Sequence, residues 1–266
     1  MKKYKLSVLF TAAVLLCSCG EASSETAEAK PYDPNRREVT ILAYPSLSDG
    51  TDKNAVSFTR LEDDLKTLKA SGSEAVLVND LIRFVNYDGE LPEKPVVLTV
   101  DDAKLNCLTK LLPLAEKYDV CFSIALKGDK AEHASDDADP DPERSYLDWK
   151  SIYALRESGR FEFTNSTCSL YTDTGRHGCT RLRSEDEREY RRLLYGDVFR
   201  LQRLCDECCQ FKPNAFVYPL GYTDKAAEEV ISECGFEATM TIGKGTNIIK
   251  KNKPETLIDL KRQNRA

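Results

Sequence analysis

Short apolar segments alternate with amphipathic segments along most of this chain, and this alternation limits the fold more than any other feature of the sequence. Val, Ile and Phe recur in the apolar segments, as is typical of buried strands. We predict strands at residues 39–44, 74–78, 95–100, 120–126, 160–163, 214–219, 237–242 and 256–260. We predict helices at residues 57–72, 80–89, 107–119, 148–159, 223–235 and from residue 184 onward. The order of these segments predicts an α/β fold with about seven parallel strands, either an open sheet or a closed barrel.

Two predicted helices carry recognisable boundary residues. Ser57 can cap the first helix at its amino end, and Gly72 can end it. Ser184 and Glu187 have the spacing of a capping box at the start of the long helix.

The strand "PVVLTV" runs directly into two adjacent acids, Asp101 and Asp102. Neighbouring carboxylates repel each other, so a pair at a strand tip indicates a site for a metal, a proton or a sugar. In sheets and barrels of parallel strands, ligands bind beyond the carboxyl ends of the strands. The segments after residues 163 and 218 should therefore lie near the aspartate pair.

The amino-terminal residues have the features of an export signal. Three lysines precede an apolar run that is too short for a membrane span, which predicts a signal peptide at residues 1–18. Leu16, Ser18 and Cys19 resemble a bacterial lipobox, which implies lipidation of Cys19 and anchoring at the outer face of the cell membrane by the lipid alone. An ordinary signal peptide is the alternative. Residues 19–38 are polar and acidic and predict a flexible tether, and the folded domain is predicted at residues 39–266.

Charge argues against nucleic acid as a partner. The formal net charge is −6, and removal of the three signal lysines would take it to about −9. The arginines between residues 188 and 203 alternate with acids, which is typical of a solvated helix face.

Eight cysteines remain after Cys17 and Cys19, and export permits disulfides. We predict a Cys168–Cys179 disulfide. The "CDECC" segment at residues 205–209 has no second Cys/His pair to complete a zinc site, so we do not predict a structural zinc there.

Four segments of the chain resemble the polysaccharide deacetylase family (NodB-homology domains, carbohydrate esterase family 4). They are "ILAYPSL", "LPEKPVVLTVDDA", "YLDWKSIYALRESGRFEFTNST" and "FVYPLGYTDKAAEEVISECGFEATMTIGKGTN", and they occur in the order that the family has. The resemblance covers nearly the whole predicted domain.

This resemblance implies a distorted (β/α) barrel, related to the TIM barrel, and metal-assisted removal of acetyl groups from glycans. It also implies that Asp101 acts as the base on a metal-bound water and that Asp102 holds the metal together with two histidines. A metal makes chemical sense because it polarises the acetyl carbonyl and supplies a nucleophile from water.

The expected histidines are absent. Their positions fall on Ser166 and on Leu170 or Tyr171, depending on the spacing of the motif. His133 and His177, the two histidines of the chain, lie in segments that indicate surface loops. Cys168 is another possible zinc ligand, but together with Asp102 it supplies two ligands. We therefore expect no cofactor, or at most a weak, degenerate zinc site.

The resemblance also implies a substrate loop at Tyr218, Pro219 and Leu220, with the Leu220 backbone amide facing the oxyanion. Tyr44, in the opening strand, is a further substrate-binding candidate.

Two functions follow from these residues. In the first, the chain is a surface lipoprotein that binds or acts on an acetylated glycan (peptidoglycan, chitin-like or xylan-like) and has lost or weakened the deacetylase activity. In the second, it is a divergent, active deacetylase of N- or O-acetyl groups with Asp101 as base. A cell-surface scaffold for a protein partner is a third class.

Overall fold

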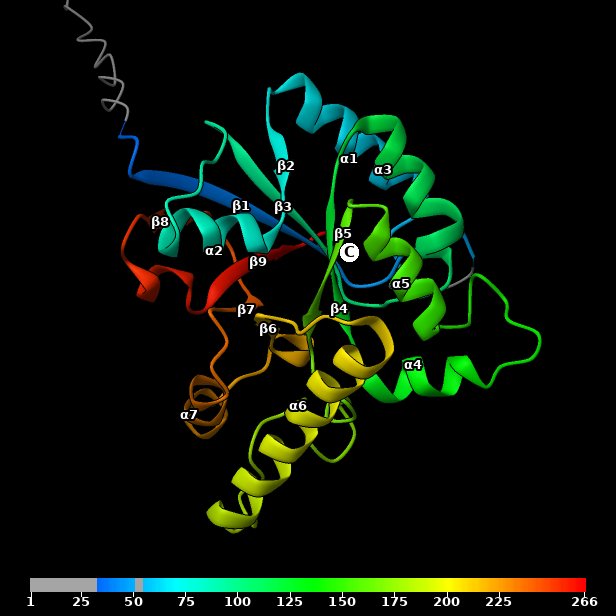
Figure 1. Cartoon of the computed structure of the whole chain (residues 1–266), viewed down its shortest axis with the longest axis vertical. Helices are drawn as coiled ribbons and strands as arrows, with labels where there is room; N and C mark the ends of the chain where they lie inside the picture. The colour runs from blue at the N-terminus through cyan, green and yellow to red at the C-terminus, as the bar shows by residue number, and fades with distance from the viewer. Residues whose placement is uncertain (1–32, 51–54) are drawn as a thin grey trace, which may run out of the picture. The chain divides into compact units, whose positions relative to one another are not determined.

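A computed structural model describes residues 33–50 and 55–266, and within these ranges seven parallel strands form a closed barrel (Figure 1). In barrel order the strands are β1 (Arg36–Tyr44), β3 (Pro95–Val100), β4 (Phe122–Leu126), β5 (Phe161–Asn165), β6 (Ala215–Val217), β7 (Ala238–Ile242) and β9 (Leu260–Asn264). Strand β1 closes the ring, because Leu42 pairs with Leu98 of β3 on one side and with Gln263 of β9 on the other. The predicted (β/α) barrel of about seven parallel strands is confirmed.

Two further described strands extend the sheet outside the ring. Strand β2 (Glu74–Val76) pairs with the amino-terminal half of β3, whose carboxyl-terminal half pairs with β4. Strand β8 (Asn247–Lys250) runs antiparallel to the start of β1 and was not predicted.

The strand predicted at residues 256–260 is wrong. The 3₁₀ turn η3 (Pro254–Leu257) ends inside that segment and buries Leu257, residues 258 and 259 form a turn, and β9 begins at Leu260. Between them Asp259 adopts a left-handed backbone conformation with φ of 57°, which turns the chain into the barrel.

Alternation along the strands separates an inner from an outer layer. Side chains on the outer face of the barrel pack under the helices, for example Leu98, Ile124 and Phe163. Those on the inner face, such as Val97, are smaller and include several polar groups, and α2 (Val78–Asn86) packs with them at the amino end of the barrel.

The remaining described helices cover the outside of the barrel (Figure 1). They are α1 (Phe58–Ala70), the π-helical turn η1 (Cys107–Leu111) with α3 (Leu112–Tyr118), α4 (Gly128–Ser135), α5 (Trp149–Glu157), α6 (Glu187–Cys209), the 3₁₀ turn η2 (Pro219–Gly221) and α7 (Lys225–Glu233). Ser57 caps α1 as predicted, by accepting a hydrogen bond from the Arg60 amide. The Ser184–Glu187 capping box is wrong: Asp186 caps α6, because its carboxylate accepts from the amides of Arg188 and Glu189. Helix α4 was not predicted.

The predicted Cys168–Cys179 disulfide is also wrong, because both cysteines are free. Cys168 is buried in one core cluster, close to Gly128 at the start of α4, whereas Cys179 packs in another cluster with residues of α6 and α7. The two thiols therefore belong to different parts of the core.

The predicted signal peptide, the lipidation site at Cys19 and most of the predicted tether lie outside the described residues. Strand β1 begins at Arg36, three residues before the predicted start of the domain. Within the described ranges, no helix has both the length and the apolar character needed to cross a membrane.

Candidate active site at the carboxyl end of the barrel

The aspartate pair lies where β3 ends, at the carboxyl end of the barrel, which we call the mouth. The Asp101 amide donates to the Tyr44 carbonyl at 3.0 Å, which continues the pairing of β3 with β1 by one residue. Both side chains are mostly buried, with exposed fractions of 21% for Asp101 and 20% for Asp102. They are held by cations from different strands.

Asp101 is paired with Arg262 of β9. The Arg262 side chain is fully buried and donates from Nη1 to Asp101 Oδ1 and from Nη2 to Asp101 Oδ2, the latter at 3.4 Å. Arg262 Nη1 also donates to Thr99 Oγ1 at 3.2 Å. Both oxygens of the proposed base therefore accept hydrogen bonds from one guanidinium group.

Asp102 is paired with Lys127, which follows β4. Lys127 Nζ lies 2.8 Å from Asp102 Oδ1, and the lysine side chain is 17% exposed. The Tyr146 hydroxyl donates to the same oxygen at 3.4 Å. Tyr146 reaches this point because the segment before α5 is tied to the segment after β3, with the Leu147 amide donating to the Ala103 carbonyl at 2.8 Å.

The positions expected to hold histidines lie on and after β5. Ser166 is buried, and its amide donates to the Leu126 carbonyl at 3.0 Å. Leu170 packs against the core under α6 and α7. The Tyr171 hydroxyl donates to Asp129 Oδ2 at 2.9 Å, and its ring lies under Lys127 Nζ, 5.3 Å from the ring centre. The structure thus brings Tyr171 to the Asp102–Lys127 pair, but it presents a ring and a neutral hydroxyl.

The other candidate ligands lie elsewhere. Cys168 is fully buried, and a Cβ added to Gly128 would lie 2.7 Å from its sulfur, so the thiol is tightly enclosed. Burial raises the pKa of the Cys168 thiol to about 12, so it stays protonated at neutral pH. His133 and His177 are exposed, as predicted, and His177 Nδ1 contacts Asp173.

The predicted substrate residues are mostly enclosed. The Tyr44 ring is fully buried on the outer face of the barrel, where its hydroxyl donates to Asp64 Oδ2 at 3.0 Å, so the ring does not face the mouth. Tyr218 and Pro219 are also buried. Leu220 is 51% exposed and has a left-handed backbone, with φ of 58° and ψ of 8°. In this group, Leu220 is the residue that a bound molecule can reach.

The sequence model of the polysaccharide deacetylase family matches residues 88–239, which is more than half of the chain. The chain belongs to the polysaccharide deacetylase family.

Comparisons with individual proteins agree with this family. The chain is 22% identical over 280 residues to the poly-β-1,6-N-acetyl-D-glucosamine N-deacetylase of Escherichia coli K12, a match that covers 91% of this chain and 40% of that protein. The chain thus spans less than half the length of this curated relative. A solved de-N-acetylase from Aggregatibacter actinomycetemcomitans has a TM-score of 0.72 at 20% identity, covering 85% of this chain and 94% of that one. The structure of IcaB from Ammonifex degensii has a TM-score of 0.68 at 19% identity, covering 85% and 91%. These two likenesses establish the fold.

The polysaccharide deacetylase resemblance implies a divalent metal, and the residues at the mouth do not fit one. Among the described residues, no group of three or more His, Cys, Asp and Glu side chains is placed to hold a metal ion. Asp102 is the predicted acidic ligand, and the Lys127 ammonium already lies against it. A divalent ion bound to the same oxygen would lie within a few ångströms of that ammonium and be repelled by it.

Neither cation that holds the aspartate pair was identified from the sequence. Arg262 lies two residues after Leu260 in β9, so both side chains point into the barrel. The residue was missed because the sequence predicted this strand at residues 256–260. Lys127 immediately follows the strand "FSIAL", at the edge where ligands bind in parallel barrels. This position in the sequence could have identified Lys127 as a site residue.

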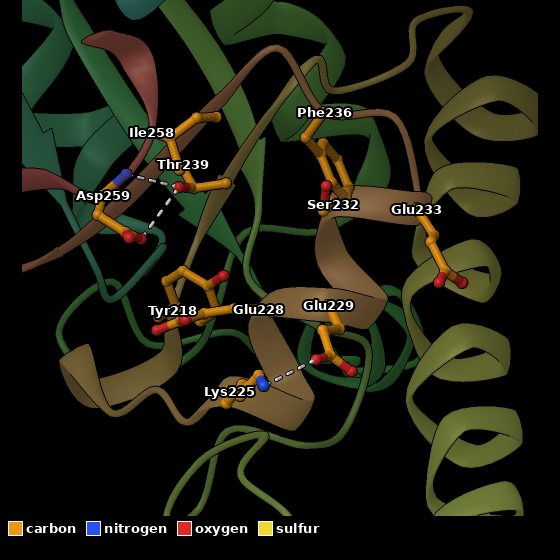
Figure 2. Close-up of a pocket in the computed structure, with 10 residues that line it drawn as sticks. All are labelled: Tyr218, Lys225, Glu228, Glu229, Ser232, Glu233, Phe236, Thr239, Ile258 and Asp259. Carbon is orange, nitrogen blue, oxygen red and sulfur yellow. Dashed lines mark hydrogen bonds and ion pairs between the residues drawn. The ribbon is translucent and has the colours of Figure 1, made fainter. Parts of the chain in front are cut away.

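A pocket of about 520 Å³ lies on the flank of this polysaccharide deacetylase domain, away from the aspartate pair (Figure 2). It is bounded by α7, the start of β7 and the turn before β9, and Tyr218 lies at one side of it. Asp259 and Thr239 bond to each other there, the Asp259 amide donating to Thr239 Oγ1 at 2.8 Å. Tyr218 is the predicted site residue that lines this pocket.

Proposed function

We propose that this chain binds an acetylated glycan at the mouth of the barrel and has lost the metal-dependent deacetylation of its family. The observation that supports this proposal is that cations of the chain itself already pair with both carboxylates, Arg262 with Asp101 and Lys127 with Asp102. Asp102 cannot coordinate a metal through Oδ1 without displacing the Lys127 ammonium, and Asp101 is held by a fully buried guanidinium group.

The chemistry of amide hydrolysis makes the loss costly. A metal lowers the pKa of bound water from about 15.7 to about 7, which supplies a nucleophile at neutral pH. Here the ligand set for a metal is incomplete, and the oxygens of Asp101 that would accept the proton from water face Arg262. Binding of a glycan needs neither a metal nor a free base.

The proposed ligand is a polysaccharide that carries acetyl groups. The name of the Escherichia coli relative favours a β-1,6-linked N-acetylglucosamine polymer, and peptidoglycan, chitin-like and xylan-like polymers share the acetylated-sugar chemistry. We further propose that the chain is exported and held at the outer face of the cell membrane by lipid on Cys19, which rests on the lipobox resemblance of residues 16–19.

An active deacetylase is the alternative. The retained Asp101–Asp102 pair and the half-exposed turn at Leu220, whose backbone amide was predicted to face an oxyanion, favour it. In that case Arg262 would have to release Asp101, and Lys127 would have to leave Asp102 when a metal binds.

One experiment separates the two functions. The purified full-length chain is analysed for bound zinc, and acetate release and binding are measured with a β-1,6-N-acetylglucosamine oligomer, a chitooligosaccharide, acetylated xylan and peptidoglycan fragments. Asp101→Asn tests the base, and Asp139→Asn is the control, because Asp139 is an exposed acid in the loop before α5. We expect glycan binding without stoichiometric zinc and without acetate release in all three proteins. Stoichiometric zinc together with acetate release that Asp101→Asn abolishes would overturn the proposal and establish the alternative.

A further inference from the structure

Three exposed side chains lie together on loops at the mouth, and the aspartate site makes no use of them. Tyr222 is 44% exposed and Leu220 51% exposed, and both belong to the loop after β6. His177, from the loop after β5, is 67% exposed, and its ring centre lies 5.1 Å from that of Tyr222 at an angle of 52°. We call His177, Leu220 and Tyr222 the rim platform.

The rim platform is built on backbone that is closely fitted. Gly178, next to His177, has a φ of 56°, and an added Cβ would lie 2.7 Å from the Pro219 carbonyl oxygen. Gly221, next to Tyr222, has a φ of 76°, and an added Cβ would lie 2.6 Å from Ile242 Cγ1. Only glycine permits this backbone at this spacing, so the two loops are pressed together and onto β7. The backbone that carries the two rings is therefore positioned before any ligand arrives, which lowers the entropy cost of binding.

A short loop connects the rim platform to the aspartate site. Tyr171 begins this loop beside Lys127 and Asp129, and the loop turns back where the Gly178 amide donates to the Thr172 carbonyl at 2.8 Å. Residues 171–178 thus join the Asp102–Lys127 pair to the rim platform.

We propose that the rim platform is a second glycan subsite, on which Tyr222 and His177 stack against a sugar ring beyond the unit at the aspartate pair. A pyranose has an apolar C–H face and polar edges. Tyr222 supplies a flat apolar face with a hydroxyl at its tip, and tyrosine provides such contact area at low conformational cost. This inference rests on the proposed glycan binding and adds the requirement for an oligomer.

The test compares two exposed tyrosines. Binding of the pentasaccharides of β-1,6-linked and β-1,4-linked N-acetylglucosamine, and of free N-acetylglucosamine, is measured by calorimetry for the full-length chain and its variants. Tyr222→Ala should weaken pentasaccharide binding about tenfold and leave the monosaccharide unaffected, whereas Tyr222→Phe, which keeps the ring, should remain within about twofold. Tyr87→Ala is the matched control, because Tyr87 is 65% exposed but follows α2 at the amino end of the barrel.

The outcomes separate this inference from the proposed function. If the unaltered chain binds a pentasaccharide and Tyr222→Ala binds it equally well, the subsite is refuted and glycan binding stands. Equal weakening by Tyr87→Ala would also refute it, since the effect would not be local. If no pentasaccharide binds to the unaltered chain, the subsite is refuted, and the proposed function then depends on the binding of acetylated xylan or peptidoglycan fragments. Circular dichroism of Tyr222→Ala confirms that a loss of binding does not reflect unfolding.

Discussion

Lys127 places a permanent positive charge 2.8 Å from Asp102, at the point where the family fold would bring a metal to the same carboxylate. An ammonium group and a metal ion both neutralise a buried acid, but they differ in chemistry. The ammonium cannot accept ligands, so it can neither hold a water for attack nor coordinate an acetyl carbonyl. Lys127 therefore supplies Asp102 with a counter-charge, and under the proposed function it takes the place that a metal would occupy.

We predict that Lys127→Ala lowers the free energy of unfolding by about 1–3 kcal/mol, because Asp102 is left mostly buried without a counter-ion. The double variant Lys127→Ala/Asp102→Ala should recover part of this loss. Lys66→Ala is the control, since the Lys66–Asp63 pair is 55% and 64% exposed and should contribute less than about 1 kcal/mol. Urea denaturation of the single and double variants gives the coupling energy, and a coupling near zero would contradict the prediction.

For single residues, the sequence predicts the two acids of the site more readily than the basic residues that pair with them. Asp101 and Asp102 stand out because they interrupt the end of a buried strand. Arg262 lies 161 residues from Asp101, and Lys127 lies 25 residues from Asp102. These pairings exist because strands β9, β3 and β4 meet in the barrel. A single sequence carries no local signal for such a meeting.

Helix α2 begins inside the molecule and is capped by a residue from another element. Glu162 of β5 accepts hydrogen bonds from the Val78 amide at 2.6 Å and from the Asn79 amide at 3.1 Å, and the Ser123 hydroxyl also donates to it. Burial raises the pKa of the Glu162 carboxyl to about 7, despite these hydrogen bonds, which favour the charged form. The start of α2 therefore depends on a carboxyl group that titrates near neutral pH.

Because the pKa of Glu162 is higher in the folded than in the unfolded chain, its contribution to stability is fully present below about pH 4.5 and is lost as pH rises through about 7. Glu162→Gln removes this titration. The stability of the variant relative to the original chain should therefore rise by about 3 kcal/mol between pH 4.5 and pH 8. Chemical denaturation at both pH values measures the change. Glu255→Gln, at an exposed acid of η3, should show no such trend, and a Glu162→Gln difference that is the same at both pH values would refute the assignment.

Hydrophobic periodicity predicted most elements correctly where the segment was long or clearly capped, as at α1. It failed between residues 254 and 264, because "TLIDL" is more apolar than "LKRQN", although the latter forms β9. Which of the two segments becomes a strand depends on closure of the barrel, in which Leu260 and Arg262 face inward and Lys261 is exposed. Helix α4 was missed because its residues, "GDKAEHAS", carry too few apolar side chains to show a helical stripe.

In the domain as a whole, β9 closes the barrel by connecting β7, late in the chain, with β1, the first strand. It pairs with β7 and β1, and its Arg262 crosses the interior to reach Thr99 and Asp101 of the β3 segment. One fully buried guanidinium thus links β9 with β3, and its Nε atom is buried without a hydrogen-bond partner among the described residues. Asp101 is the acid that pairs with this buried guanidinium, and removing either partner leaves the other mostly buried and unpaired.

Arg262→Met should therefore be strongly destabilising, by about 3 kcal/mol or more, because it leaves Asp101 mostly buried and unpaired. Adding Asp101→Asn should restore part of the loss. Arg265→Met provides the comparison, since Arg265 pairs with Asp64 outside the barrel and is 32% exposed. Thermal and urea unfolding measure the series, and equal effects of the two arginine substitutions would contradict a special role for the buried one.

The thiols provide a test of the whole core. The described part of the chain has eight free cysteines, and of these Cys208 is exposed. In the native protein, a thiol reagent should modify Cys208 rapidly and the buried thiols only as the domain opens. After denaturation all eight of these described cysteines should react. If two of these cysteines failed to react in the denatured, unreduced protein, the predicted disulfide would be supported.

The closure of the ring through β1 also has a consequence for synthesis. Leu42 of β1 pairs with Gln263 of β9, about 220 positions later in the chain. One edge of β1 therefore stays unpaired until β9 has been synthesised, and contacts between residues so far apart in sequence form slowly. A nascent chain consequently exposes the free edges of β1 and β7 until the last strand has emerged. Those edges can recruit strands from other copies, so the vulnerable period for aggregation ends only when β9 inserts.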